Sequence, residues 1–507
     1  MNGRRKISYT RCAVGLAMVA ISAALRAQPS TLRTPATIDT LPAAVGTPFG
    51  DSVIQVLARR EHPSMRWAQL SDVASSIRRL YAENNWQPLW SRDGIPTPLA
   101  ASVLRVLHDA DERGLSPADY DAQFLSTVPR TTALWDVAMT ADVLRLATAL
   151  RFGRVEAASI YTGLHLPRDT VDLTAFIQVL RSSGMAKSEH DTVGRDEWVR
   201  AQFDTLEPPW SHYWLLRHAL QTYREYAVSA EPLPADLTPA LVQTRILQIA
   251  LALERWRWLP QAFSTAPIFI NIPAFRLYAF SSPYDDGAPT LLNMDVAVGK
   301  AFRTRTPVFS AFLTTVIFSP YWDVPPSIAM KEIMPKARRD LGYLERSHME
   351  IVSVPGGRVL PLTSSSLARV PGGTARIRQR PGADNALGGV KFVFPNEYNV
   401  YLHDTPMQSV FQQARRDVSH GCIRVAEPAR LAAFVLRDQP QWTASAIESA
   451  MHQPTPRQVT MKTRIPVFVV YTTVIARSDG QTLFYDDLYG HDRTLAARLA
   501  RGYPYTR

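Results

Sequence analysis

The hydrophobic pattern changes its period near residue 260, and this change constrains the fold more than any other feature of the chain. From 51 to 260, apolar residues recur at helical spacing, as in "TPLAASVLRVLHDADERG", where Thr97 can cap a helix and Gly114 can end one. From 266 onward, short β-rich runs such as "APIFINIPAFRLYAF" and "VKFVFP" stand between Gly, Pro and Asn. The pattern predicts an α+β protein, with a helical domain over 51–260 followed by a β-sandwich-like domain.

Two segments interrupt the β-rich part. Residues 328–348 have a helical pattern, and residues 353–387 are loop-like and rich in Gly and Pro. We expect them to form a capping insertion, about 328–387, inside a domain that spans 266–440. Residues 441–507 are predicted to be a C-terminal extension, in which "IPVFVVYTTVIA" and "GQTLFYDDLYG" form a closing hairpin.

The N-terminal segment predicts export. Four basic residues precede an apolar run of 14 residues, Cys12–Leu25, and small residues follow it. This is the layout of a signal peptide over residues 1–27, cleaved after Ala27, with an uncleaved anchor as the alternative. Residues 28–50 resemble a flexible linker. The five basic residues of the signal leave +6 of the formal net charge of +11, which suits an anionic wall or membrane surface and gives no argument for nucleic acid.

Removal of this signal would leave Cys422 as the single cysteine of the mature chain, with no internal disulfide. Cys422 lies in "DVSHGCIRV", and His403 ends the strand-like run "NVYLH". An imidazole at a strand end could take the proton of a thiol in a neighbouring turn, since the thiolate is the attacking form. Gly421 would let the backbone approach a reacting carbonyl, and the amides nearby could hold an oxyanion.

Two other interpretations of Cys422 are open from these residues. A lone cysteine is often a small buried hydrophobe, although Ser419, His420 and Arg424 make a purely apolar slot less suitable. His403, His420 and Cys422 could supply three zinc ligands, but neither paired-Cys nor HExxH spacing supports a metal site.

At this point the residues resemble a known family. His403, then 15 residues, then Ser419-His420-Gly421-Cys422 with Arg424, is similar to the signature of the L,D-transpeptidase (YkuD-type) catalytic domain. The runs "FINIPAFRLYAF", "GGVKFVFPNEYNVYLHDTP" and "PVFVVYTTVIARSDGQTLFYDDLYGHD" extend the resemblance to the large periplasmic YcbB-type branch. The helical part then resembles the scaffold domain of that branch.

Two departures from the branch stand out. The small peptidoglycan-binding module is missing, because Tyr226 passes to the helix start at Thr238 through a short link. Asp323 stands in "YWDVP", where a neutral amide is expected. The first departure puts independent wall anchoring in doubt, and not the chemistry.

The resemblance implies a role for each residue of the motif. Cys422 would be the nucleophile and His403 its base. Tyr401 lies two residues before His403 on the same strand face, where it would help to hold the oxyanion or the acceptor, or simply pack on the sheet.

For His420 and Arg424, several roles stay open. His420 would shape the pocket, orient the thiol or be structural. Arg424 would bind a substrate carboxylate, brace the loop or form a surface ion pair. Ser419 would stabilise the loop through its hydroxyl.

The function that follows is a periplasmic peptidoglycan L,D-transpeptidase that forms 3–3 cross-links without a cofactor or a metal. Its partners would be peptidoglycan stem peptides, a tetrapeptide donor and a diamino acid acceptor, with further wall-synthesis enzymes as additional partners, and contact with the membrane only through the signal or anchor segment. The resemblance also implies acylation by carbapenems. Alternatives are an L,D-carboxypeptidase or a lipoprotein–wall ligase using the same cysteine, and a non-catalytic wall-binding scaffold.

Overall fold

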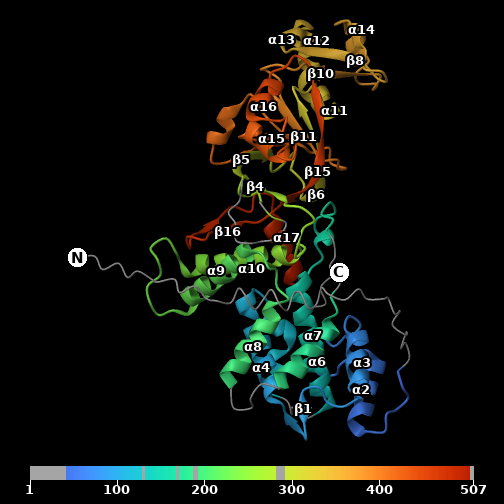
Figure 1. Ribbon diagram of the computed structural model, residues 1–507, viewed down its shortest axis with the longest axis vertical. Coiled ribbons are helices and arrows are strands. Elements are labelled where there is room, and N and C mark those ends of the chain that lie inside the picture. Colours follow the sequence, from blue (N-terminus) through green and yellow to red (C-terminus); the bar gives the residue numbers. More distant parts are fainter. Residues whose placement is uncertain are drawn as a thin grey trace, which may run out of the picture.

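The computed structural model describes residues 41–502, except 128–131, 167–170, 186–191, 281 and 283–291. The predicted signal peptide, its cleavage site and most of the predicted linker therefore lie outside the described residues. Figure 1 shows a helical domain at one end of the long axis, a β-domain beyond it and a smaller cap at the far end. Within the described ranges, no helix combines the length and hydropathy needed to cross a membrane.

The helical domain is built around α6, most of which is buried. Thr97 caps α4 and Gly114 ends the 3-10 turn that follows it, as expected for both residues. The elements of this domain are α2 Pro48–Arg59, α3 Ala74–Glu83, β1 Ser91–Arg92, β2 Ile95–Pro96, α4 Pro98–His108, η1 Asp109–Arg113, η2 Pro117–Tyr120, α5 Ala122–Thr127, α6 Ala133–Phe152, η3 Ala157–Ser159, α7 Leu173–Met185 and α8 Thr192–Asp204.

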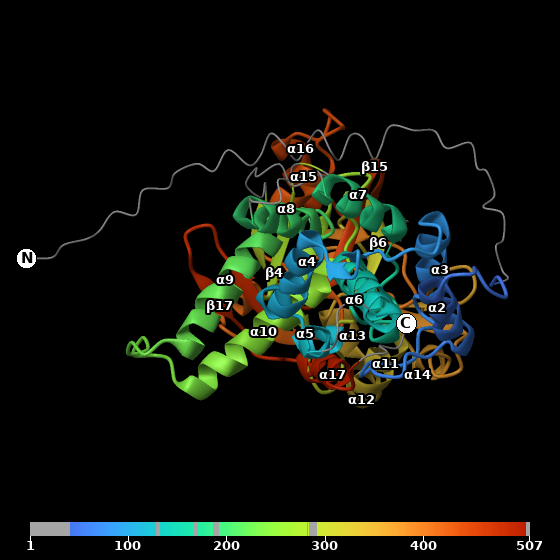
Figure 2. The same cartoon turned by 90° about the horizontal axis from the view of Figure 1, so that it is seen from below.

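A long helical hairpin joins the helical domain to the β-domain. It consists of α9 Ser211–Val228 and α10 Pro239–Arg257, which lie side by side and project from the remaining helices in Figure 2. Residues 229–238 connect the two helices without a regular element. The short link agrees with the sequence, which leaves no room for a separate module here.

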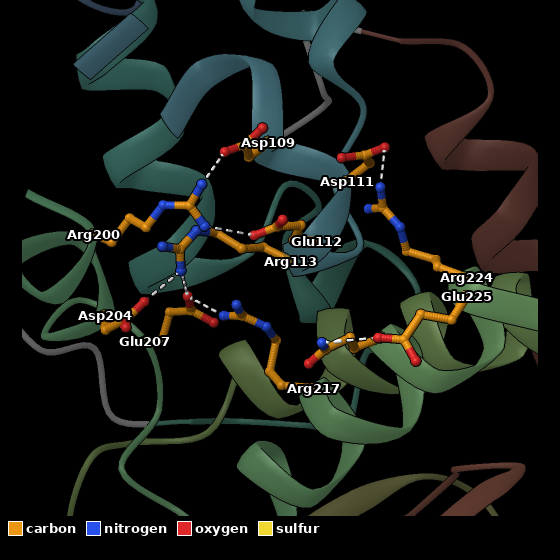
Figure 3. Close-up of polar contacts among 11 residues, drawn as sticks. Asp109, Asp111, Glu112, Arg113, Arg200, Asp204, Glu207, Arg217, Arg224 and Glu225 are labelled. Atoms are coloured by element: carbon orange, nitrogen blue, oxygen red, sulfur yellow. Dashed lines mark hydrogen bonds and ion pairs between the residues drawn. The ribbon is translucent and has the colours of Figure 1, made fainter. Parts of the chain in front are cut away.

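A network of ion pairs fixes this hairpin to the helical domain (Figure 3). Arg113 of η1 pairs with Glu207, and Arg217 of α9 binds the same carboxylate at 2.5 Å. Glu207 has no exposed side-chain surface. Burial alone would raise the pKa of Glu207, but the neighbouring guanidinium groups outweigh it, so the pKa is lowered.

The β-domain is a closed barrel, and the predicted sandwich-like arrangement is wrong. Among the described residues, eight strands follow the order β5-β14-β12-β11-β6-β15-β3-β4, and β4 pairs with β5 to close the circle. Closure removes the free edges that two separate sheets would leave. The strands are β3 Ile268–Asn271, β4 Arg276–Ala279, β5 Leu292–Gly299, β6 Phe309–Phe318, β11 Val390–Val393, β12 Leu402–His403, β14 Ile423–Val425 and β15 Arg457–Val470, with β13 Asp417–Ser419 added beside β5.

The C-terminal part is not a separate extension from residue 441 onward. Strand β15 lies between β6 and β3, so the barrel reaches residue 470 and a boundary at 440 would cut through it. The hairpin predicted beyond it is present as β16 and β17, although its first half begins later than expected. The other elements of this part are η5 Gln408–Gln412, α15 Pro428–Val435, α16 Ala444–Met451, β16 Val474–Ala476, β17 Thr482–Phe484 and α17 His491–Leu499.

The cap is an ordered subdomain, and the prediction of a loop over 353–387 is wrong. Its four-stranded sheet has the order β7-β10-β8-β9 and covers its own apolar cluster, which includes Leu344, Ile351 and Ile377. The elements are β7 Trp322–Asp323, α11 Pro326–Ile328, the π-helical turn η4 Ala329–Ile333, α12 Met334–Arg339, α13 Gly342–Arg346, β8 Met349–Ser353, β9 Val359–Leu360, α14 Ser364–Ala368 and β10 Ala375–Gln379.

Candidate active site

Three neighbouring strands place the predicted site residues on the outer face of the barrel. In the parallel pair of β12 with β14, Leu402 is opposite Ile423 and His403 is opposite Arg424. Leu402 and Ile423 are fully buried in the core, so the alternate residues face outward. On the other side of β12, Lys391 of β11 is opposite His403.

The register therefore brings most of the motif together. The side chains on this outer face are those of Lys391, Tyr401, His403, Cys422 and Arg424. Cys422 precedes β14 and lies across from Tyr401, whose carbonyl accepts the Ile423 N–H at 3.0 Å. His403 is diagonal to Cys422.

A tight turn between β13 and β14 carries the cysteine. Gly421 has a φ of +117°, which L side chains rarely adopt, so the turn requires glycine at this position. Ser419 is buried, accepts the Gly421 N–H at 3.1 Å and donates to the Cys422 carbonyl at 2.5 Å. These bonds agree with the loop-stabilising role expected of Ser419. Because the Gly421 amide is already bonded, its part in an oxyanion hole stays a prediction.

The Cys422 thiol is partly buried and bonds to the segment before β12. Sγ lies 3.8 Å from the carbonyl oxygen of Asn399, and Tyr401 also hydrogen-bonds the thiol. Burial raises the pKa of Cys422, while Tyr401, Lys391 and Arg424 act in the opposite direction. The raised pKa keeps the thiol protonated in the free protein, and the neighbouring cations would stabilise a thiolate once it forms. A fully buried filler role is wrong, because the residue is partly exposed.

His403 is almost completely buried, and its orientation is set by the backbone. Nδ1 lies 2.5 Å from the carbonyl oxygen of Asp404, which can only accept. Nδ1 must therefore carry the proton, and Nε2 keeps its lone pair. Burial lowers the pKa of His403 to about 3, with Arg424 and Lys391 adding to the effect and the Asp404 bond opposing it. The imidazole is neutral at physiological pH.

The expected hydrogen bond between this imidazole and the thiol is not formed. Within the described chain, the thiol partners are Asn399 and Tyr401, and the His403 ring has an edge contact with Tyr401 at a centroid distance of 5.7 Å. Catalytic hydrogen bonds are often longer in a free enzyme than in its complex with substrate. The two groups share one face, and the proton transfer between them remains a prediction.

Two cations complete the face, and sequence reasoning identified only one of them. Arg424 is half-buried, and its buried Nε has no hydrogen-bond partner among the described residues. Lys391 was missed: its Nζ lies 3.7 Å from the centroid of the Tyr401 ring. Burial lowers the pKa of both groups. Neither forms an ion pair within the described ranges, so the surface ion pair considered for Arg424 is wrong. The missed signal was the position of Lys391 in "VKFVFP", next to the histidine strand.

His420 contacts the cap. Its Nε2 lies 2.7 Å from Oε1 of Glu332 in η4, and both side chains are substantially exposed. His420 therefore links the cysteine turn to the cap. The described residues contain no converging group of three metal-ligating side chains, so the zinc geometry considered for His403, His420 and Cys422 is not present. Asp323, the departure in "YWDVP", pairs with Arg376 of β10 at 2.8 Å.

A partly exposed cysteine beside a neutral imidazole and two cations without carboxylate partners is typical of an enzyme with a cysteine nucleophile. Residues 266–467 match the model of the L,D-transpeptidase catalytic domain, YkuD, and residues 75–220 match that of the Scaffold domain. The chain therefore contains one region similar to each of these two domains.

A curated relative supports the assignment. A Haemophilus influenzae protein described as "Putative L,D-transpeptidase" is 30% identical over 271 residues, which cover 53% of this chain and 53% of the relative. The chain thus matches about half the length of that relative.

Proposed function

We propose that this protein is a peptidoglycan L,D-transpeptidase that uses Cys422 as its nucleophile. The observation that carries the proposal is the outer face shared by Cys422, His403, Lys391 and Arg424, within a domain of the matching family. We also propose that the protein acts in the periplasm, because its first 27 residues have the layout of an export signal.

In the first half of the reaction, the Cys422 thiol gives its proton to Nε2 of His403, and the thiolate attacks the carbonyl of the third stem residue. The tetrahedral intermediate then breaks its bond to the terminal D-alanine, whose amine leaves with the proton from Nε2. The product is a thioester on Cys422. The neutral imidazole, with its free Nε2, suits both proton transfers.

In the second half, the side-chain amine of a diamino acid on another stem attacks the thioester. His403 takes a proton from this amine, and the Cys422 thiolate leaves and is protonated again. The new amide is the 3–3 cross-link. No oxidant, reductant or cofactor takes part, because both halves are acyl transfers.

Lys391 and Arg424 would supply the charge that the neutral imidazole lacks. A thiolate in a partly buried site is costly, and two cations that form no ion pair within the described ranges reduce this cost. Arg424 is also placed to bind the free carboxylate of a stem peptide through its guanidinium group. The Tyr401 hydroxyl, beside the thiol, would orient the nucleophile or the oxyanion.

The test is to incubate the protein with purified tetrapeptide muropeptides and to analyse the products by mass spectrometry. We expect 3–3 dimers and free D-alanine from the natural chain, and at least a thousandfold less of both from Cys422→Ser. Cross-linking by Cys422→Ser at the natural rate would refute the proposal. If the products were tripeptides without dimers, the acyl group would be transferred to water, as in a carboxypeptidase. If no dimers formed and a lysine of a protein were modified, the enzyme would be a ligase.

A further inference from the structure

The loop between β5 and β6 is attached directly to the cysteine turn. We call residues 300–306 the basic loop. Its fixed position follows from contacts at both ends: Gly299, just before it, packs so tightly on the Thr304 carbonyl that no Cβ would fit. Four hydrogen bonds join the loop to the turn and its strand: Lys300 N to Ser419 O at 3.2 Å, Thr304 Oγ1 to Ser419 O at 2.9 Å, Thr306 Oγ1 to Gly421 O at 2.8 Å, and Ala301 N to Asp417 Oδ2 at 3.2 Å.

The basic loop displays an aromatic ring to solvent. Phe302 is 91% exposed, more than any other large hydrophobic residue that the structure describes. A single exposed apolar residue is common on protein surfaces. Here, however, the ring belongs to a loop that is hydrogen-bonded to the turn that carries Cys422.

Three cationic residues belong to the same loop. Lys300, Arg303 and Arg305 are all exposed, and none of them forms an ion pair in the part of the chain that the structure describes. Arg305 is partly committed to the fold, because Nε donates to the Ala301 carbonyl at 2.5 Å and the guanidinium lies over the Tyr489 ring. Among the residues that the structure describes, Lys300 and Arg303 have no such side-chain contact. The loop is therefore a small basic surface with a free aromatic ring at its centre.

We propose that the basic loop is a binding surface for the acidic stem peptides of peptidoglycan. Lys300 and Arg303 would pair with their free carboxylates, and Phe302 would pack on the peptide or the attached sugar. This inference rests on the proposed function. It also gives a place for wall contact in a chain whose helical hairpin carries no additional module. Charge complementarity selects this occupant, since a terminal carboxylate is a fixed feature of the substrate proposed above.

The experiment measures binding of the full chain to purified, insoluble peptidoglycan by co-sedimentation. The background variant is Cys422→Ala, so that no turnover occurs. On this background we compare Phe302→Ala and the double variant Lys300→Ala with Arg303→Ala. The matched control is Lys462→Ala with Arg464→Ala, which removes the same charge from exposed positions of β15. Circular dichroism verifies that every variant is folded.

We expect the loop variants to bind about tenfold more weakly, and the control to bind normally, because exposed ion pairs each contribute modestly. Binding should weaken with salt and with enzymatic removal of the stem peptides from the glycan. Unchanged binding by the loop variants would overturn the inference. So would unchanged binding to peptide-free glycan, or loop-dependent binding to phosphatidylglycerol vesicles with none to the wall.

The two proposals fail in different ways. If the natural chain forms no 3–3 dimers but its wall binding depends on the loop, the binding surface stands and the reaction is wrong. If dimers form and the loop variants show an unchanged KM and unchanged binding, the reaction stands and the binding surface is wrong.

Discussion

Two clusters of charge in this molecule follow opposite rules. In the helical domain, Glu207 is buried without exposed side-chain surface, and Arg113 and Arg217 bind its carboxylate (Figure 3). The Tyr213 hydroxyl also donates a hydrogen bond to this carboxylate. On the outer face of the barrel, Lys391 and Arg424 are half-buried, and neither forms an ion pair within the described ranges, although the Asp323 carboxylate acts on Lys391 electrostatically.

The presence or absence of an ion-pair partner distinguishes charges that stabilise the fold from charges that are available to bind a ligand. A buried carboxylate persists only if cations and hydrogen bonds replace its hydration. A half-buried cation without such a partner lowers stability, and sites that retain one are commonly functional. We therefore assign the partnered cluster to the fold, and the reaction proposed above uses the unpartnered one.

The largest effect on stability is expected at the partnered cluster. Glu207→Gln leaves Arg113 and Arg217 without their shared carboxylate, so the free energy of unfolding should fall by about 3 kcal/mol or more. Urea denaturation measures this change. The control Glu225→Gln changes an exposed residue whose carboxylate accepts a hydrogen bond from Gln221, and its effect should stay within about 0.5 kcal/mol. Equal effects of the two variants would contradict a structural role for Glu207.

The buried imidazole predicts a pH dependence of stability. The pKa of His403 is about 3 in the folded chain and 6.5 as the reference, so the unfolded chain binds the extra proton. The stability from the neutral ring is present above pH 6.5 and is lost between pH 6.5 and 3, by about 1.4 kcal/mol per pH unit at most. Denaturation of the natural chain and His403→Gln across this range should therefore give a steeper slope for the natural chain. Identical slopes would show that the ring titrates normally.

A moderate effect on rate is expected at the unpartnered cluster. Lys391→Met removes a cation near the thiolate, so the pKa of Cys422 should rise and kcat should fall about tenfold, or about 1.4 kcal/mol in the barrier. Alkylation of the thiol as a function of pH reports the first change, and muropeptide turnover the second. Stability should not fall, because the variant buries no charge. Lys462→Met on β15 is the matched control. If Lys391→Met were less stable than the natural chain but its thiol were alkylated with an unchanged pH dependence, Lys391 would be a structural residue.

The smallest effect is expected at the contact between the cysteine turn and the cap. Glu332→Gln replaces the exposed partner of His420, and an exposed pair contributes at most about 1 kcal/mol. We expect an unchanged unfolding midpoint and a two- to threefold change in KM for muropeptides. A large loss of stability would show that this contact holds the cap in place.

The sequence predicted the parts of the fold that depend on local pattern. The spacing of apolar residues predicts the helices over 51–260. The capping chemistry of Thr97 and Gly114 predicts where one helix begins and where the turn after it ends. Barrel closure depends on pairing between β4 and β5 and on β15 joining strands far away in sequence, for which no local signal exists. The Gly and Pro residues of 353–387 indicated a loop, so β9, β10 and α14 were not predicted. These elements share an apolar cluster that forms only when the whole cap folds.

The site divides in the same way. Cys422, His403 and Arg424 were found because the motif carries them within one stretch of chain. Lys391 was missed because its importance lies in the register of β11 with β12. The orientation of His420 toward Glu332 depends on where the cap folds, which the motif does not encode.

The most direct test of the account is the intact mass of the protein after exposure to a carbapenem, followed by peptide mapping. If the thiol on the unpartnered face is the nucleophile, the natural chain should gain the mass of one acyl group, located on Cys422, and Cys422→Ser should gain none. An unmodified natural chain, or an equal adduct on Cys422→Ser, would contradict it.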